Sequence, residues 1–191
     1  RMAYDHHEVH LQAKINALDN NNPIFPWEKK GNTVEEGVQV CRWAEEAGAD
    51  AIHVSSGAFF PHPRNPAGSD LPVEDLVNSY DTMISSGERT FANFLLFHGA
   101  SGALARRQWN QEAGPVSEIE GKNLPDAKAI KAAVTVPVIC TGGFQTASVI
   151  EKAIKAGACD GVSMARTLVA NNDLPKVFAS GKDQAAKPCT Y

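Results

Sequence analysis

The chain has 191 residues, of which 43% are hydrophobic and 21% are charged, which is an ordinary composition for a globular domain with a buried core. A formal net charge of −4 provides no basic surface for nucleic acid or for an anionic membrane. No stretch approaches the roughly 18 consecutive apolar residues of a membrane span, so none is expected.

The four cysteines are widely spaced, at positions 41, 140, 159 and 189, and no two of them form a Cys-x-x-Cys pair. This spacing favours reduced thiols over a disulfide framework and therefore predicts a cytoplasmic protein. The chain begins at Arg1 rather than at a methionine and stops at Tyr191. We therefore expect it to be part of a longer polypeptide.

The first part of the chain predicts a strand, a helix and a second strand. Thr33 and Glu36 form a capping-box pattern at the start of the helix, and Gly48 follows its end. The helix carries an apolar stripe that includes Cys41 and Trp43. The expected elements are a strand over residues 11–18, a helix over about 34–47 and a strand over 51–57.

A long irregular stretch, from about residue 59 to about residue 121, is rich in proline. Two short helices are expected within it, over 73–84 and 90–97. An insertion of this length between the strands of a barrel is usually functional or lies over the mouth of the active site. His62 and Arg64 lie within this stretch and are candidate substrate contacts.

The sequence of the last part of the chain predicts a parallel βαβ unit with flanking helices. The expected elements are a helix over 126–134, a strand over 136–141, a helix over 147–157, a strand over 161–166 and a helical piece over 168–180. Together with the first part this makes four β units, whereas a closed (β/α)8 barrel needs eight. The fold class is therefore α/β, and the chain is predicted to be half of such a barrel.

Gly142, Gly143 and Arg166 fall where the last two strands end, which is where barrels place their ligands. Glycine lets backbone N–H groups approach an anion closely, and an arginine fork suits phosphate oxygens. This pattern predicts a phosphate site. A Gly-Gly pair also forms plain tight turns, and an arginine at a strand end also forms surface ion pairs, so the spacing alone leaves both alternatives open.

Several segments in order resemble the Old Yellow Enzyme family of FMN-dependent NADH:flavin oxidoreductases, which includes the 2,4-dienoyl-CoA reductases. The resemblance covers roughly residues 11–191 and only the C-terminal half of the family's barrel, strands five to eight. We take residues 1–191 as half of a single domain. The matching segments are residues 13–16, 46–57, 136–143, 160–166 and 168–175.

The resemblance implies a bound FMN, with NADH or NADPH as the hydride donor. It places Lys14 near the N1/C2=O edge of the flavin, where a cation stabilises the reduced anion. It places Gly142 and Gly143, together with Ala165 and Arg166, at the FMN phosphate. The ordinary alternative for Lys14 is a strand-end lysine that extends to solvent.

The family's substrate-binding pair and its usual proton-donating tyrosine belong to the half of the barrel that precedes Arg1, so no catalytic residue is assigned here. One branch of the family binds a 4Fe–4S cluster after this region, and Cys189 is a candidate first ligand. Ser55, Ser56 and Gly57 are expected at the mouth of the barrel, and His53 in the core. His6 and His10 have zinc-like spacing without a third ligand, so no metal site is predicted.

Two rival functions stay open at this stage. The first is a Schiff-base aldolase-type barrel in which Lys14 is the nucleophile and the phosphate site holds the substrate. The second is a non-catalytic scaffold or self-associating module. In each case a half-barrel would expose strand edges and an apolar inner face, so we expect a homo-oligomer or association with the missing half. The ligand expected at the active site is a small-molecule substrate.

Overall fold

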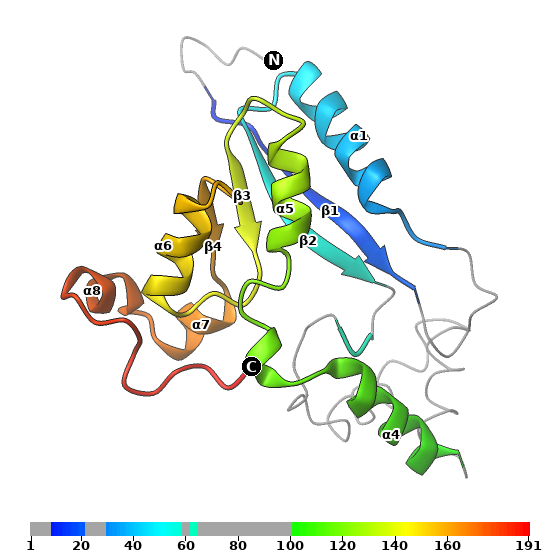
Figure 1. Ribbon diagram of the computed structural model, residues 1–191, viewed down its shortest axis with the longest axis vertical. Helices are drawn as coiled ribbons and strands as arrows, with labels where there is room; N and C mark the ends of the chain where they lie inside the picture. The colour runs from blue at the N-terminus through cyan, green and yellow to red at the C-terminus, as the bar shows by residue number, and fades with distance from the viewer. Residues whose placement is uncertain (1–8, 22–29, 59–61, 65–100) are drawn as a thin grey trace.

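The computed structural model describes residues 9–21, 30–58, 62–64 and 101–191. Its centre is a four-stranded parallel sheet in which the order of the strands, β1-β2-β3-β4, is also their order along the chain (Figure 1). The four predicted strands are therefore confirmed. Their bounds are Gln12–Asn20 for β1, Ala51–Ala58 for β2, Val138–Thr141 for β3 and Gly161–Ser163 for β4.

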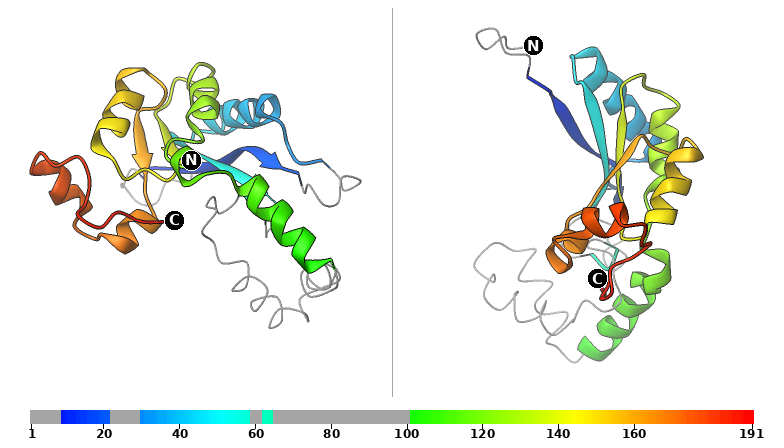
Figure 2. Two further views of the ribbon diagram at one scale, coloured as in Figure 1. Left: turned by 60° about the horizontal axis from the view of Figure 1, so that its bottom comes forward. Right: turned by 90° about the vertical axis from the view of Figure 1, so that its left-hand side faces the viewer.

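Three helices, α1, α5 and α6, lie on one face of this sheet (Figures 1 and 2). The helices are α1 (Val34–Glu46), α4 (Gly102–Ala113), the 3-10 turn η2 (Val116–Glu118), α5 (Leu124–Lys131), α6 (Ala147–Lys155), α7 (Arg166–Ala170) and α8 (Leu174–Ala179). The helices predicted over 73–84 and 90–97, and His6, lie outside the described residues. In the part of the chain that is described, no helix has the length and apolar character needed to cross a bilayer.

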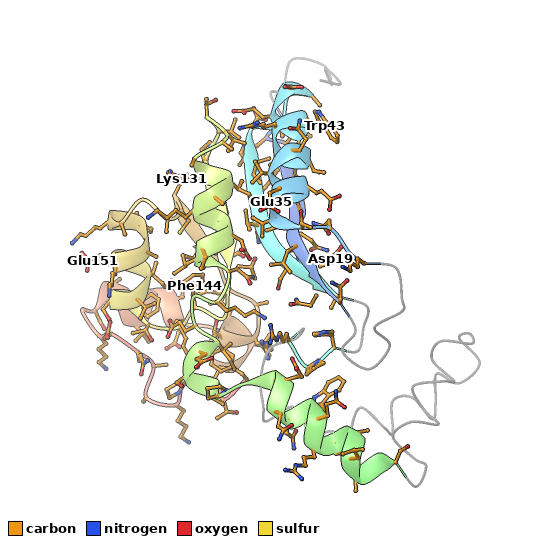
Figure 3. The ribbon with its side chains drawn as sticks, turned by 45° about the vertical axis from the view of Figure 1, so that its right-hand side comes forward. Asp19, Glu35, Trp43, Lys131, Phe144 and Glu151 are labelled. Atoms are coloured by element: carbon orange, nitrogen blue, oxygen red, sulfur yellow. The ribbon has the colours of Figure 1, made fainter. Side chains whose placement is uncertain are left out.

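The hydrophobic core fills the space between the sheet and these helices. Every second residue of the strands points into it, including Ile52 and Val54 of β2 and Cys140 of β3, all fully buried. Phe144, from the loop after β3, is also fully buried and closes the lower end of this core (Figure 3). The predicted stripe on α1 is correct for Cys41, which is buried, but wrong for Trp43, which is 58% exposed.

Helix α1 packs unusually close to strand β1 at Gly37. A Cβ atom at this position would lie 2.2 Å from the carbonyl oxygen of Ala17. The neighbouring atom is main chain, so it cannot rotate away as a flexible side chain could. The absence of a side chain at Gly37 is therefore what lets helix and strand meet.

We expect Gly37→Ala to destabilise the fold by about 1–3 kcal/mol, the usual cost of overpacking. Helix propensity alone predicts the opposite sign, a gain of about 1 kcal/mol for alanine over glycine. Chemical denaturation of the two proteins decides between these effects. A variant that is as stable as the parent would show that α1 is not held this closely to β1.

The other face of the sheet carries polar side chains, and the expectation of an apolar inner face is wrong. The strand registers place Lys14 beside His53, and Asn16 beside Ser55, on this face. Next to them, the His53 Nε2 atom lies 2.5 Å from the Thr141 hydroxyl and 2.6 Å from the Ser163 hydroxyl. His53 is consequently half-buried in a polar cluster across three strands rather than in the apolar core.

Carboxylates hold the N-terminal ends of the strands in place. The Asp50 carboxylate accepts a hydrogen bond from the backbone N–H of Leu11 (2.9 Å), and the Asp160 carboxylate accepts one from Val138 (2.9 Å). Glu45 accepts from the backbone N–H and the hydroxyl of Thr135 (2.7 and 2.6 Å). These hydrogen bonds, led by the one from the Thr135 side chain, lower the pKa of Glu45.

The single helical piece predicted over 168–180 is in fact two short helices, α7 and α8. Pro175 occupies the first turn of α8, where its missing N–H costs nothing. The same residue could not continue a helix from Ala170, because the proline ring clashes with the preceding turn. The chain therefore turns between the two helices.

Candidate functional site

A pocket of about 390 Å³ lies at the C-terminal edge of the sheet. It brings together four of the five residues proposed for cofactor binding, Lys14, Gly142, Gly143 and Arg166, whereas Ala165 is not among its lining residues. The strand-end residues Ser55, Ser56 and Gly57 also line it, as expected for the mouth. The remaining lining residues are Asn16, Ala58, Ile119, Lys122, Asn123 and Thr141.

The charges of this pocket are all of one sign. Lys14, Lys122 and Arg166 line it, and no aspartate or glutamate is present among its described lining residues. A concave site with three cations and glycine backbone suits an anion, and a phosphate group in particular. We call it the cationic pocket.

The glycine loop of the cationic pocket has a backbone that favours glycine. Gly143 has a φ of 64°, in the left-handed region, and a Cβ atom there would lie 2.8 Å from the Ile119 side chain. The carbonyl oxygen of Gly142 accepts a hydrogen bond from the N–H of Gly121 (2.6 Å). The loop is thus fixed against the segment that precedes α5.

Arg166 and Gly143 are connected through Tyr191. Arg166 Nη1 donates a hydrogen bond to the Tyr191 carbonyl oxygen (2.8 Å), and its guanidinium lies 5.4 Å from the centre of the tyrosine ring. The Tyr191 hydroxyl in turn donates to the carbonyl oxygen of Gly143. Tyr191, which the sequence did not single out, therefore contacts both parts of the candidate phosphate site.

The N-terminus of α6, close to the glycine loop, is already occupied. The Glu120 carboxylate accepts hydrogen bonds from the backbone N–H groups of Gln145 and Thr146 (2.8 and 2.7 Å) and from the Thr146 hydroxyl (2.8 Å). An anion in the cationic pocket would therefore be bound by the glycine loop and by cations of the pocket. The backbone N–H groups at the start of this helix are instead satisfied by Glu120 and stabilise the fold.

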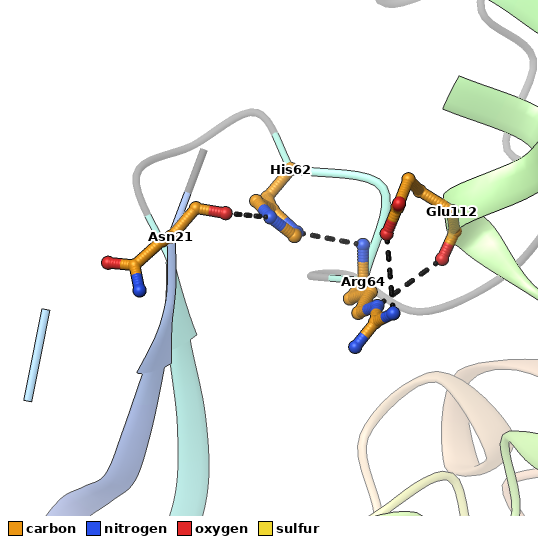
Figure 4. A network of polar contacts seen from close by, with 4 residues as sticks. All are labelled: Asn21, His62, Arg64 and Glu112. Carbon is orange, nitrogen blue, oxygen red and sulfur yellow. Dashed lines mark hydrogen bonds and ion pairs between the residues drawn. The ribbon is translucent and has the colours of Figure 1, made fainter. Parts of the chain in front are cut away.

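A second pocket of about 610 Å³ adjoins the cationic pocket, and the lining residues that the two share are Ser56, Ile119, Lys122 and Asn123. Arg64 lines this pocket and pairs with Glu112 (3.2 Å), as shown in Figure 4. His62 is buried and is not among the residues that line this pocket. Its Nδ1 atom accepts from the backbone N–H of Arg64 (3.1 Å), so its Nε2 atom carries the proton and donates to the Asn21 carbonyl (2.9 Å).

These hydrogen bonds require a neutral His62, and burial lowers its pKa below the ordinary value of 6.5. Protonation then favours the unfolded chain, so stability is full above about pH 6.5 and falls as the pH drops from there toward the folded-state pKa. We expect His62→Gln, which keeps a donor but cannot titrate, to lose less stability between about pH 7.5 and about pH 5. Denaturant unfolding across this range measures the difference, and parallel curves for the two proteins would contradict it.

The comparisons with known proteins connect this geometry to a family. A NADH oxidase of Thermoanaerobacter brockii is 25% identical over 159 residues, 83% of this chain and 17% of that protein. A metal reductase of Desulforamulus reducens is 29% identical over 136 residues, 66% of this chain and 20% of that protein. A NADH-dependent flavin oxidoreductase of Talaromyces variabilis is 48% identical over 42 residues, 22% of this chain and 10% of that protein.

The chain is similar, at low identity, to an Old Yellow Enzyme-like family. The predicted resemblance is confirmed at that level, and the chain spans a fifth or less of the length of these curated relatives. No protein-family model matches it. The solved structure of a 6-hydroxypseudooxynicotine amine oxidase from Pseudomonas geniculata gives a partial match only, with a TM-score of 0.32 and 13% identity over 83% of this chain and 31% of that one.

Proposed function

We propose that this chain is part of an FMN-dependent oxidoreductase that uses NADH or NADPH to reduce an activated alkene, such as an enone or a dienoyl thioester. The observation that carries the proposal is the cationic pocket, because Lys14, Gly142, Gly143 and Arg166 converge there from separate strands and loops. The names of the similar proteins, with NADH and flavin among them, support the same class of reaction.

We further propose that the sheet is the second half of a (β/α)8 barrel. Strand order equals chain order, and α1, α5 and α6 cover one face only (Figure 2). A doubly wound α/β sheet would carry helices on both faces, whereas a barrel carries them on the outside alone. In this proposal the polar face with Lys14 and His53 lines the inside, and the remaining strands or a second copy of the chain cover the open edges.

The donor set fits the phosphate monoester of FMN. Arg166 would contact the phosphate oxygens with two parallel N–H groups, and the glycine loop would present its backbone N–H groups to them. Lys14 would lie at the pyrimidine edge of the ring and stabilise negative charge there. These residues would hold FMN, which would supply hydride transfer from NAD(P)H to the β-carbon of the alkene, with a proton added at the α-carbon to complete the reduction.

An anaerobic absorption experiment on the complete protein tests this function. We expect a bound flavin whose visible absorption is lost on addition of NADH or NADPH and returns on addition of an enone. A protein that carries no flavin, or a flavin that neither nucleotide reduces, would contradict the proposal. Borohydride trapping of an imine on Lys14 would instead support the aldolase alternative, which no described contact favours.

A further inference from the structure

Lys122 is the one cation of the cationic pocket that the sequence did not suggest. It stands in the segment between η2 and α5, next to Asn123, whose side-chain amide donates to the carbonyl oxygen of Thr141 (2.6 Å) at the end of β3. This hydrogen bond fixes the segment over the C-terminal edge of the sheet. Lys122 lines both the cationic pocket and the second pocket, so it stands at the boundary between them.

The Lys122 ammonium has two arginines among its charged neighbours and no ion-pair partner in the described part of the chain. Its Nζ atom donates to the carbonyl oxygen of Arg64 (2.6 Å), and among the described residues no carboxylate lies within salt-bridge distance of it. Burial, and then the charges of Arg64 and Arg166, lower its pKa, while Asp126 acts in the opposite direction. A half-buried lysine that has no ion-pair partner and is repelled by two arginines gains from a bound anion.

We propose that Lys122 is an anion-binding residue, and that a phosphate group in the cationic pocket contacts both Lys122 and Arg166. The identity of the ligand as FMN rests on the proposed function, whereas the chemistry, a phosphate dianion between two cations, rests on the pocket alone. The carbonyl oxygen of Arg64 holds the lysine side chain in position for this contact. The two cations come from different segments, since Lys122 precedes α5 and Arg166 begins α7.

The test uses inorganic phosphate as the probe and measures its affinity from the phosphate-dependent rise in unfolding temperature, at constant ionic strength. Lys122→Gln removes the charge but keeps a donor for the Arg64 carbonyl. Lys128→Gln is the matched control, because Lys128 is exposed and lines neither pocket. We expect Lys122→Gln to weaken phosphate binding by about ten-fold or more, Lys122→Arg to retain most of it, and Lys128→Gln to leave it unchanged. Equal affinities for Lys122→Gln and Lys128→Gln would overturn the proposal.

A measurement on the unsubstituted protein does not depend on whether a variant folds. Saturating phosphate should slow acetylation of Lys122 several-fold relative to Lys128, as followed by peptide mass spectrometry. Equal protection of the two lysines would also overturn the proposal. If phosphate protects Lys122 but the protein binds no flavin, the assignment of FMN fails and Lys122 stands. If FMN binds in an Arg166-dependent manner and Lys122→Gln has no effect, only the inference about Lys122 fails.

Discussion

Replacing Arg166 with alanine should weaken the binding of FMN by about ten- to a hundred-fold while changing riboflavin binding little. The two ligands differ only in the phosphate, so their comparison isolates the contact. Arg166 lines the cationic pocket at the start of α7, and a charge-assisted hydrogen bond to phosphate contributes about 1.5–3 kcal/mol. Flavin fluorescence titration of the complete protein measures both affinities.

Two further variants sharpen this experiment. Arg107→Ala removes an equal charge from an exposed position of α4 and should leave both affinities unchanged. Arg166→Lys keeps the charge but loses the planar fork, so FMN binding should fall to an intermediate value. Equal weakening of FMN and riboflavin by Arg166→Ala would remove Arg166 from the phosphate site.

Replacing Lys14 with methionine should lower the midpoint potential of the bound flavin and slow its reduction by NADH or NADPH. The lysine lies on the polar face of β1 and lines the cationic pocket, where a positive charge favours the reduced, anionic ring. Loss of roughly 1–2 kcal/mol of this stabilisation corresponds to about 20–40 mV for a two-electron couple. Anaerobic redox titration of the FMN-loaded protein gives the shift directly.

Lys176→Met is the control for this measurement, since Lys176 is exposed on α8 and lines neither pocket. It removes the same charge and should leave the potential where it was. If Lys14→Met is folded and retains FMN with an unchanged potential, the lysine has only the structural role of a strand-end side chain.

The helices and strands whose positions depend on residues close together in the sequence could be predicted from it. Thr33 and Glu36 were expected to cap α1, and both halves of the capping box are present. Gly48, with a φ of 96°, follows the end of that helix as predicted. The positions of helix α1 and its two flanking strands are determined by nearby residues in the sequence. Local sequence patterns were therefore sufficient to predict them.

Features that depend on packing between distant segments could not be predicted in this way. The polarity of the open sheet face arises because His53, Thr141 and Ser163 meet across three strands, 88 and 110 residues apart in the chain. Lys122 has no periodic pattern or motif around it, and its importance follows from its position beside Arg64 and Arg166. The location of Gly142, Gly143 and Arg166 was predictable because strand ends in parallel sheets converge on one edge.

The carboxylates of Asp50, Glu45 and Asp160 stabilise the strands at a place distant from the residues that would contact a ligand. They bind backbone amides at the N-terminal ends of the strands, whereas the cationic pocket lies at the opposite edge. A library of variants confined to the pocket-lining positions would leave all three carboxylates and their amide partners intact. Selection for new ligands could therefore vary the side chains at the C-terminal edge, apart from Gly143 and Asn123, without removing the contacts at the N-terminal ends of the strands.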